Sequence, residues 1–336
     1  MRYRRLGDSG VSVSTLCLGT MMFGDRTGEA EATEIVAACR DAGVNFVDTA
    51  DVYARGESER ITGRAIASDR HRWVLATKVG NPMGADPNRR GLSRRWLSQA
   101  IDDSLARLGT DHVDVWYLHR EDPSVPLQET VAAVADIVRA GKVRYLGVSN
   151  HRAWRLAEIV HWCAAAGLPP PAVVQPYYNA FNRMPEVEVL PACARWGIGV
   201  APYSPVARGV LTGKYPPGAT PPEGSRAARN DARLMQTEWR EESLVAAQRV
   251  AGHARSRGMT PSQFAVAWVL NNRHVSSAIV GPRTLEQMRE YLDGADAPFD
   301  AQDEALIDAI VPAGHATTPH YTDPSYPVEG RATFTG

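Results

Sequence analysis

The fold follows from one stretch, WVLATKVGNPMGADPNRRGLSRRWLSQAIDDSLARLGTDHVDVWYLH, residues 73–119. Its two ends, WVLATKVG (73–80) and HVDVWYLH (112–119), are short, apolar and not clearly alternating, which is typical of parallel strands buried on both faces. Between them, SRRWLSQAIDDSLARLG (93–109) predicts a helix that opens on a capping serine and ends at a glycine. The stretch therefore predicts a strand, a helix and a second, parallel strand.

The same order of strand and helix repeats along most of the chain. Two more helices are predicted, at 127–141 and at 260–272, where Thr260, Pro261 and Gln263 form a capping-box pattern. The other short apolar runs are STLCLGT (14–20), NFVDTA (45–50), VRYLGVSN (143–150), AVVQPYYN (172–179), IGVAPYSP (198–205) and SAIVG (277–281). Eight strands, each followed by a helical segment, predict an α/β fold, a (β/α)8 TIM barrel.

Three segments do not fit this repeat. Residues 2–14, with GDSG at the centre, predict an N-terminal β-hairpin. The loop after the seventh strand, 214–240, is rich in Pro, Gly and Arg and is long for such a loop, and the tail 311–336 has no helical or strand period. Long irregular loops inside compact domains are often functional. No internal linker is visible, so we expect one domain over residues 1–336.

Composition excludes several classes of protein. The 336 residues are 44% hydrophobic and 22% charged with a net charge of −1, which fits a globular chain and argues against a nucleic-acid partner. No run is long enough to span a bilayer, and the N-terminus lacks a signal-peptide apolar stretch. The four cysteines are far apart, without CxxC spacing, and are expected to be buried: Cys17, Cys39, Cys163 and Cys193. We expect a cytoplasmic protein without a membrane partner.

Unusual residues fall at the carboxyl ends of the predicted strands. They are Asp48 (with Tyr53 just beyond), Lys78, His119, Ser149, Asn150, Gln175, Tyr203, Ser204, Gly281 and Arg283. Each alone has an ordinary interpretation as a cap, a solvated charge or a structural group. In a (β/α)8 barrel, however, these ends meet at one mouth, where active sites lie. The His161–Trp162–Cys163 run predicts no metal site, because neighbouring residues on a helix point apart.

Four of these residues form a chemically coherent set. Tyrosine is a poor proton donor near neutral pH because its free pKa is about 10. A lysine ammonium such as Lys78 stabilises phenolate and lowers the pKa of a neighbouring Tyr53, and a carboxylate such as Asp48 keeps the lysine charged and in place. A histidine such as His119 can orient a carbonyl or assist proton transfer. The set suits protonation of a carbonyl oxygen while hydride reaches the carbon.

The sequence around these residues resembles the aldo-keto reductase superfamily. The resemblance is carried by FVDTADVYARGESER (46–60), LATK around Lys78, YLHR around His119, GVSN (147–150), VQPYYN (174–179) and PYSPVARGVLTGKY (202–215), and it extends from about residue 3 to about 311. It implies a (β/α)8 barrel and NADPH-dependent reduction of aldehydes and ketones. Tyr53 would be the general acid, Lys78 would lower its pKa, Asp48 would pair with Lys78, and His119 would orient the carbonyl.

The resemblance also implies a cofactor site for NADP(H). Ser149, Asn150 and Gln175 would bind the nicotinamide carboxamide, and Tyr203 would stack on the ring. The stretch around the pyrophosphate and ribose would use Ser204, Pro205, Val206, Gly209 and Lys214; the adenosine end would use Gly281, Arg283 and Gln287; Gly19, Thr20, Met21 and Asp48 complete the expected contacts. Two departures stand out: Tyr291 where the family usually has Asn, and Gly281 where some branches carry lysine. No early strand is followed by GxGxxG, so a Rossmann site is not indicated.

Several functions stay open at this stage. The long 214–240 loop resembles the branch with potassium-channel β subunits and bacterial reductases of small aldehydes and sugar derivatives. The alternatives are therefore a reductase of small carbonyl compounds, a cofactor-sensing regulatory subunit, and a ketoreductase of a nucleotide-linked sugar; a homo-oligomer is compatible with each. Substrate choice is expected to lie in Met21, Met22, Phe23, the 80–92 loop, Arg120 and the tail. Asp51 is expected to serve local turn chemistry, and His151 the start of a helix.

Overall fold

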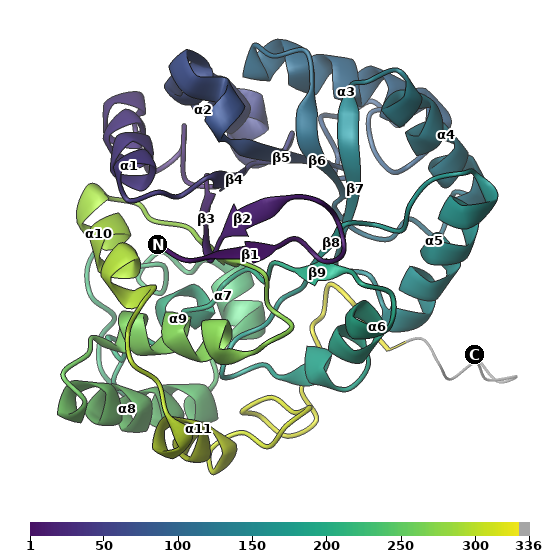
Figure 1. Cartoon of the computed structure of the whole chain (residues 1–336). Helices are drawn as coiled ribbons and strands as arrows, with labels where there is room; N and C mark the ends of the chain where they lie inside the picture. Colours follow the sequence, from purple (N-terminus) through teal and green to yellow (C-terminus); the bar gives the residue numbers. More distant parts are fainter. Residues whose placement is uncertain (329–336) are drawn as a thin grey trace, which may run out of the picture.

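The computed structural model describes residues 1–328, in which eight parallel strands form a closed barrel ringed by helices (Figure 1). The strands are β3 (Leu16–Gly19), β4 (Phe46–Asp48), β5 (Val74–Val79), β6 (Val113–Leu118), β7 (Val143–Ser149), β8 (Val173–Gln175), β9 (Gly199–Val200) and β10 (Ala278–Val280). Their order is β10-β3-β4-β5-β6-β7-β8-β9. The ring closes where Val200 pairs with Val275 and Tyr203 with Ile279, both in parallel. The predicted (β/α)8 barrel is confirmed.

The barrel interior is filled with side chains. The buried residues there are Leu6, Val13, Cys17, Phe46, Ala76, Val115, Tyr117, Val173, Ala201 and Ile279. Leu6 and Val13 come from the N-terminal hairpin of β1 (Tyr3–Arg5) and β2 (Ser12–Ser14), which pair antiparallel. Gly7 has φ +61, and a Cβ there would lie 2.3 Å from the Gly197 carbonyl oxygen, so only glycine fits. The predicted hairpin thus closes the amino-terminal end of the barrel (Figure 1).

Helices cover the outside of the barrel with their apolar faces inward. They are α1 (Glu29–Asp41), α2 (Glu57–Ile66), α3 (Arg94–Leu108), α4 (Leu127–Arg139), α5 (Ala153–Ala165), α6 (Val189–Arg195), α7 (Ala232–Thr237), α8 (Glu241–Ser256), α9 (Pro261–Asn271), α10 (Leu285–Gly294) and α11 (Ala301–Asp308). Short 3-10 turns are η1 (Tyr53–Gly56), η2 (Ala67–Arg72), η3 (Met184–Glu186) and η4 (Ala207–Gly209). Within the described residues, no helix combines the length and the apolar character needed to cross a membrane.

The predicted helix ends are confirmed at α3 and α9. The Ser93 side chain accepts a hydrogen bond from the Trp96 N–H, and Gly109 ends α3 in the left-handed region. At α9, Thr260 and Gln263 form the reciprocal capping box, with proline at the first helical position. All four cysteines are buried and unpaired, as expected.

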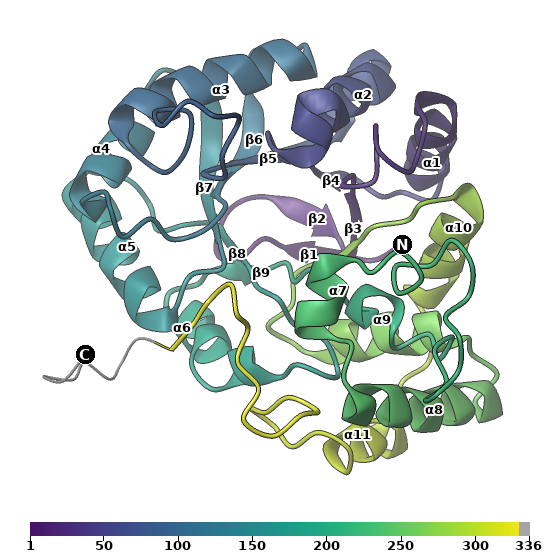
Figure 2. The ribbon, with the colours of Figure 1, turned by 180° about the vertical axis from the view of Figure 1, so that it is seen from behind.

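The two irregular segments meet at the carboxyl end of the barrel. The 214–240 loop contains α7, which the sequence did not predict, and the described part of the tail, 311–328, passes beside it (Figure 2). Arg233 of α7 binds the Asp323 carboxylate of the tail with two hydrogen bonds, of 3.0 and 2.7 Å. Arg152, just before α5, donates to the Pro327 carbonyl oxygen at 2.6 Å. The rest of the tail prediction, 329–336, lies outside the described residues.

Candidate active site

The barrel brings Asp48, Tyr53 and Lys78 into one hydrogen-bonded group. Asp48 is the last residue of β4, and Lys78 lies on the neighbouring strand β5. The Lys78 Nζ donates to Asp48 Oδ2 at 2.5 Å, to the Thr49 carbonyl oxygen at 2.8 Å and to the Tyr53 hydroxyl at 3.1 Å. Lys78 is fully buried, so these three acceptors are its compensation for the loss of water. Residues that are distant in sequence thus act on one ammonium.

The loop that carries Tyr53 has an unusual backbone. Ala54 and Arg55 follow it with φ of 46° and 55°, in the left-handed region that non-glycine residues rarely occupy. Each such residue costs about 1–2 kcal/mol. The loop then enters α2, whose Glu59 is buried and accepts from Thr77 Oγ1 at 2.6 Å and Arg107 Nε at 2.5 Å. This anchored helix holds the strained turn in place.

The charges of the group follow from burial and proximity. Burial lowers the pKa of Lys78, but Asp48 and Tyr53 raise it by more, so the ammonium form is favoured. Burial raises the pKa of the Tyr53 phenol, and the Lys78 ammonium opposes this increase. Lys78 therefore acts in the predicted direction, while the net pKa of Tyr53 is raised rather than lowered. The phenol keeps its proton near neutral pH.

His119 completes the set from the end of β6. Its ring lies edge-on to the Tyr53 ring, with centroids 6.0 Å apart. Burial lowers the pKa of His119 well below its usual value, and the positive charges of Lys78 and Arg120 lower it further. The imidazole is therefore neutral near pH 7, when one ring nitrogen donates and the other accepts. Asn81, which the sequence reasoning missed, places its amide nitrogen 3.0 Å from His119 Nδ1.

The residues expected at the nicotinamide continue this network along the rim. Gln175 Nε2 donates to Asp48 Oδ1 at 2.9 Å, and Ser149 Oγ donates to the Gln175 carbonyl oxygen at 2.8 Å. Asn150 Nδ2 donates to the His119 carbonyl oxygen and to Ser149 Oγ, both at 3.0 Å. Tyr203 donates to Asn150 Oδ1 at 2.9 Å. These residues therefore form one connected wall beside Asp48, Tyr53, Lys78 and His119.

Comparison with known proteins identifies the family of this chain. The model of the aldo/keto reductase family matches residues 15–312. The chain belongs to the aldo/keto reductase family. Among its relatives, a "Probable voltage-gated potassium channel subunit beta" of Arabidopsis thaliana is 40% identical over 305 residues, 88% of this chain and 92% of that protein.

Other relatives of this aldo/keto reductase family member carry enzyme names. The "Uncharacterized oxidoreductase YrpG" of Bacillus subtilis is 34% identical over 331 residues, 95% of this chain and 98% of that protein. The "L-glyceraldehyde 3-phosphate reductase" of Escherichia coli O157:H7 is 32% identical over 330 residues, 94% of this chain and 93% of that protein. The resemblance inferred from the motifs is confirmed, including the branch with channel β-subunit-like and bacterial oxidoreductase relatives.

A group of cations surrounds Lys214, a residue that the sequence analysis expected at the cofactor pyrophosphate and ribose. Burial lowers the pKa of Lys214, and the neighbouring Arg283, Arg226 and Arg229 lower it further. Arg226 binds Asp231 at 3.0 Å, whereas among the described residues no carboxylate pairs with Lys214, Arg229 or Arg283. Arg283 also donates to the Gly224 carbonyl oxygen at 3.2 Å, which joins the end of the barrel after β10 to the long loop. Such uncompensated positive charge fits a bound polyanion.

The sequence predicted half of this cation group. Lys214 was expected at the pyrophosphate and ribose and Arg283 at the adenosine end, and Gln287 Oε1 accepts from the Arg283 N–H at 2.8 Å. Arg226 and Arg229 were missed, because the arginines of an irregular loop carry no periodic signal of where they point. Two of the four cations could therefore be identified only from the structure of the folded loop.

The other expected cofactor residues have distinct environments. Thr20 is fully buried, and its hydroxyl contacts the Asp48 carbonyl oxygen at 3.2 Å and Ser58 Oγ at 2.9 Å, so it supports the end of β4 and the start of α2. Gly19 ends β3, whereas Met21 is 37% exposed. Ser204, Pro205, Val206 and Gly209 lie in the turn after β9, where Ser204 has φ 60°, and Gly281 directly follows β10. Their contacts with a cofactor remain predictions.

Two further expectations from the sequence come out differently. Asp51 lies in the turn after β4, as expected, but it is 1% exposed, and among the described residues neither carboxylate oxygen has a hydrogen-bond partner of normal geometry. His151 lies before α5, as expected, but is buried with its Nδ1 2.8 Å from the Ser149 carbonyl oxygen. Burial lowers the pKa of His151 to about 4, so it is a neutral packing residue.

Among the described residues no group of His, Cys, Asp and Glu forms a metal site.

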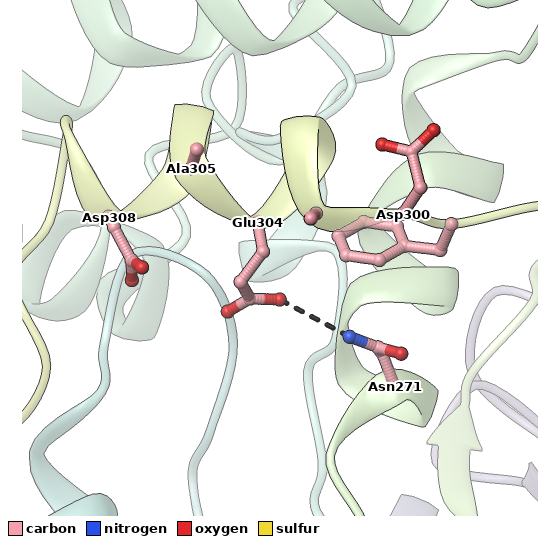
Figure 3. Close-up of a pocket in the computed structure, with 7 residues that line it drawn as sticks. Asn271, Asp300, Glu304, Ala305 and Asp308 are labelled. Atoms are coloured by element: carbon pink, nitrogen blue, oxygen red, sulfur yellow. Dashed lines mark hydrogen bonds between the residues drawn. The ribbon is translucent and has the colours of Figure 1, made fainter.

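One cavity lies beside α9 and α11, and none of the candidate active-site residues lines it. It has a volume of about 450 Å³ and is bordered by Asn271 at the end of α9 and by α11 (Figure 3). Its acids already serve the fold: Asp300 caps α11, and Glu304 accepts from Trp268 Nε1 at 3.2 Å and Asn271 Nδ2 at 3.4 Å. We assign it no role in catalysis.

Proposed function

We propose that this aldo/keto reductase family member is an NADPH-dependent reductase of small aldehydes, ketones or sugar-derived carbonyl compounds, which it converts to alcohols. One observation carries the proposal: the fully buried Lys78 ammonium bridges the Asp48 carboxylate and the Tyr53 hydroxyl at 2.5 and 3.1 Å. A phenol beside such an ammonium is a proton donor whose product, phenolate, is stabilised electrostatically.

The roles of the residues follow from their protonation states. Tyr53, neutral because burial raises its pKa, donates its proton to the carbonyl oxygen. The Lys78 ammonium stabilises the phenolate that remains, and Asp48 holds Lys78 in position. Neutral His119 donates a hydrogen bond to the same carbonyl oxygen and so orients it. When bound, the reduced nicotinamide supplies the hydride that the carbonyl carbon receives.

The choice of NADPH over NADH rests on the cation group of Lys214, Arg226, Arg229 and Arg283. A ribose 2′-phosphate adds charge that arginine binds well, and three of these four cations have no carboxylate partner within the described residues. Ser149, Asn150, Gln175 and Tyr203 would hold the nicotinamide end. The residues present therefore fit this cofactor at both of its ends.

The test is a steady-state screen of NADPH oxidation, with NADH alongside, over aldehydes, α-keto compounds and keto-sugars. We expect turnover with at least one class, and Tyr53→Phe should lower kcat by about 10²- to 10⁴-fold because the proton donor is lost. The matched control is Tyr3→Phe. Tyr3 lies at the opposite end of the barrel, where its hydroxyl donates a hydrogen bond to the Gly43 carbonyl oxygen. Turnover that survives in Tyr53→Phe would remove Tyr53 from its assigned role.

A second function is favoured by the Arabidopsis relative, whose name describes it as a channel β subunit. The chain would then bind the dinucleotide as a sensor and associate with a membrane partner, with little turnover. Negligible NADPH oxidation over the whole panel, together with co-purification of a membrane protein, would support this alternative. Efficient turnover that depends on Tyr53 would exclude it as the main role.

A further inference from the structure

The side-chain amide of Asn81 contacts the Nδ1 atom of the His119 ring and leaves the other ring nitrogen, Nε2, free of this contact. Asn81 lies just beyond β5, and His119 lies just beyond β6. The two strands are neighbours in register, with Val79 opposite Leu118, and the His119 N–H donates to the Val79 carbonyl oxygen at 2.8 Å. The barrel therefore holds the backbones of these two segments side by side, and Asn81 Nδ2 lies 3.0 Å from His119 Nδ1.

The loop that carries Asn81 is closed at its base. The Gly91 N–H donates to the Gly80 carbonyl oxygen at 2.9 Å, and the Leu92 N–H donates to Asp122 Oδ2 at 2.8 Å. Asp122 belongs to the loop after His119, so one carboxylate links both loops. This cross-link restrains Asn81 relative to the imidazole.

The chemistry of this contact selects one form of the histidine. An amide nitrogen only donates hydrogen bonds, so His119 Nδ1 must present its lone pair. In a neutral imidazole the single proton then resides on Nε2. We propose, on the basis of the function proposed above, that Asn81 is a positioning residue that fixes His119 as the Nε2–H tautomer. The Nε2–H is thereby available as the donor to the substrate carbonyl oxygen.

The neutral state of His119 makes the tautomer decisive. Burial, Lys78 and Arg120 lower the pKa of the ring well below its usual value, so it has one proton rather than two. With the proton on Nδ1, Nε2 would offer a lone pair to an oxygen that also carries lone pairs, and the interaction would be repulsive. Loss of one preorganised donor to a developing oxyanion costs on the order of 10²-fold in kcat.

The experiment is to record histidine ¹⁵N–¹H correlation spectra of the full-length protein and of two variants, with His119→Gln used to assign the signals. Wild type should show the His119 proton on Nε2. In Asn81→Asp the carboxylate accepts from Nδ1, so the proton should move to Nδ1; in Asn81→Ala the constraint is lost, and both tautomers should be present. A proton on Nδ1 in wild type, or unchanged His119 signals in both folded variants, overturns the proposal.

Kinetics give a second readout that a purely structural role would not change. Asn81→Asp should lower kcat by about 10²-fold near pH 8, with a smaller loss in Asn81→Ala. The carboxylate that Asn81→Asp introduces favours imidazolium, which carries a proton on both nitrogens. The activity of this variant relative to wild type should therefore recover as the pH is lowered toward 6, and a pH-independent loss would contradict the proposal. If wild type turns nothing over, the proposed function fails, while the spectra still decide the tautomer.

Discussion

At the scale of single residues, the protonation of Asp51 is coupled to folding. It is 1% exposed, and burial, together with the nearby Glu59 carboxylate, raises its pKa to about 8 despite the opposing charge of Arg107. In the unfolded chain its pKa is about 4. Between about pH 4 and 8 the folded state therefore holds a proton that the unfolded state has lost. The contribution of Asp51 to the free energy of unfolding is therefore greatest below about pH 4 and declines as the pH rises toward 8.

Replacing Asp51 with asparagine removes that decline. Asp51→Asn should be more stable than wild type by an amount that grows with pH at up to about 1.4 kcal/mol per unit and levels off above about pH 8. Urea denaturation of both proteins at about pH 5, 6.5 and 8 measures it. A difference in unfolding free energy that does not change with pH would show that Asp51 ionises alike in the folded and unfolded chains.

The sequence revealed the candidate catalytic residues better than it revealed their partners. Asp48, Lys78 and His119 could be predicted because each ends an apolar run, and strand ends of a barrel converge by construction. Asn81 could not, since its role depends on how two loops are registered across β5 and β6. The burial of Asp51 could not be predicted either, because the local sequence DTADVY does not indicate whether an acidic residue between a strand and a turn faces solvent.

At the scale of secondary structure elements, α2 and α3 approach so closely that one helix position admits only glycine. A Cβ on Gly63 would lie 2.1 Å from the backbone oxygen of Leu108, the last residue of α3. Backbone atoms cannot rotate away as a side-chain end can, so the helices would have to separate. Gly63→Ala should therefore destabilise the protein by about 1–3 kcal/mol or more.

The same substitution in α8 should have the opposite sign. A Cβ on Gly252 meets no atom within 4 Å, and alanine is favoured over glycine in a helix by about 1 kcal/mol. Thermal unfolding of Gly63→Ala and Gly252→Ala, side by side, tests the pair. If both variants shift the Tm in one direction, close packing of α2 on α3 is not what determines the effect at Gly63.

The ends of the elements show why their lengths were harder to predict than their existence. The apolar run 172–179 gives only three residues of β8, because Pro176 follows Gln175 and has no N–H for the ladder. Likewise β9 covers two residues of the run 198–205, and Pro202 interrupts it before Tyr203 bridges Ile279. A run of hydrophobic residues predicts that a strand exists, whereas the backbone N–H groups available for hydrogen bonding determine how long it is.

At the scale of the whole molecule, the tail connects parts of the barrel mouth that are remote in sequence. Arg233 and Asp323 join α7 to the tail, and Arg240 donates to Thr318 Oγ1 at 2.6 Å and packs over the Tyr321 ring at 4.0 Å. Burial raises the pKa of Tyr203, and Tyr326 of the tail raises it further, so the tail reaches the rim of the barrel near Tyr203. The loop with α7 also carries Arg226 and Arg229, so one segment touches both the cation group and the tail.

The Arg233–Asp323 pair should therefore restrain the whole tail. In a double-mutant cycle of Arg233→Ala and Asp323→Ala we expect a coupling of about 1 kcal/mol, modest because the arginine is partly exposed. In either variant, limited proteolysis should cut within 317–328 faster than in wild type. Ser325→Ala is the control, because it removes only the neutral contact of Arg233 at 2.8 Å and leaves both bonds to the carboxylate. Equal cleavage rates in wild type and Asp323→Ala would mean that Arg240 and Arg152 hold the tail without this pair.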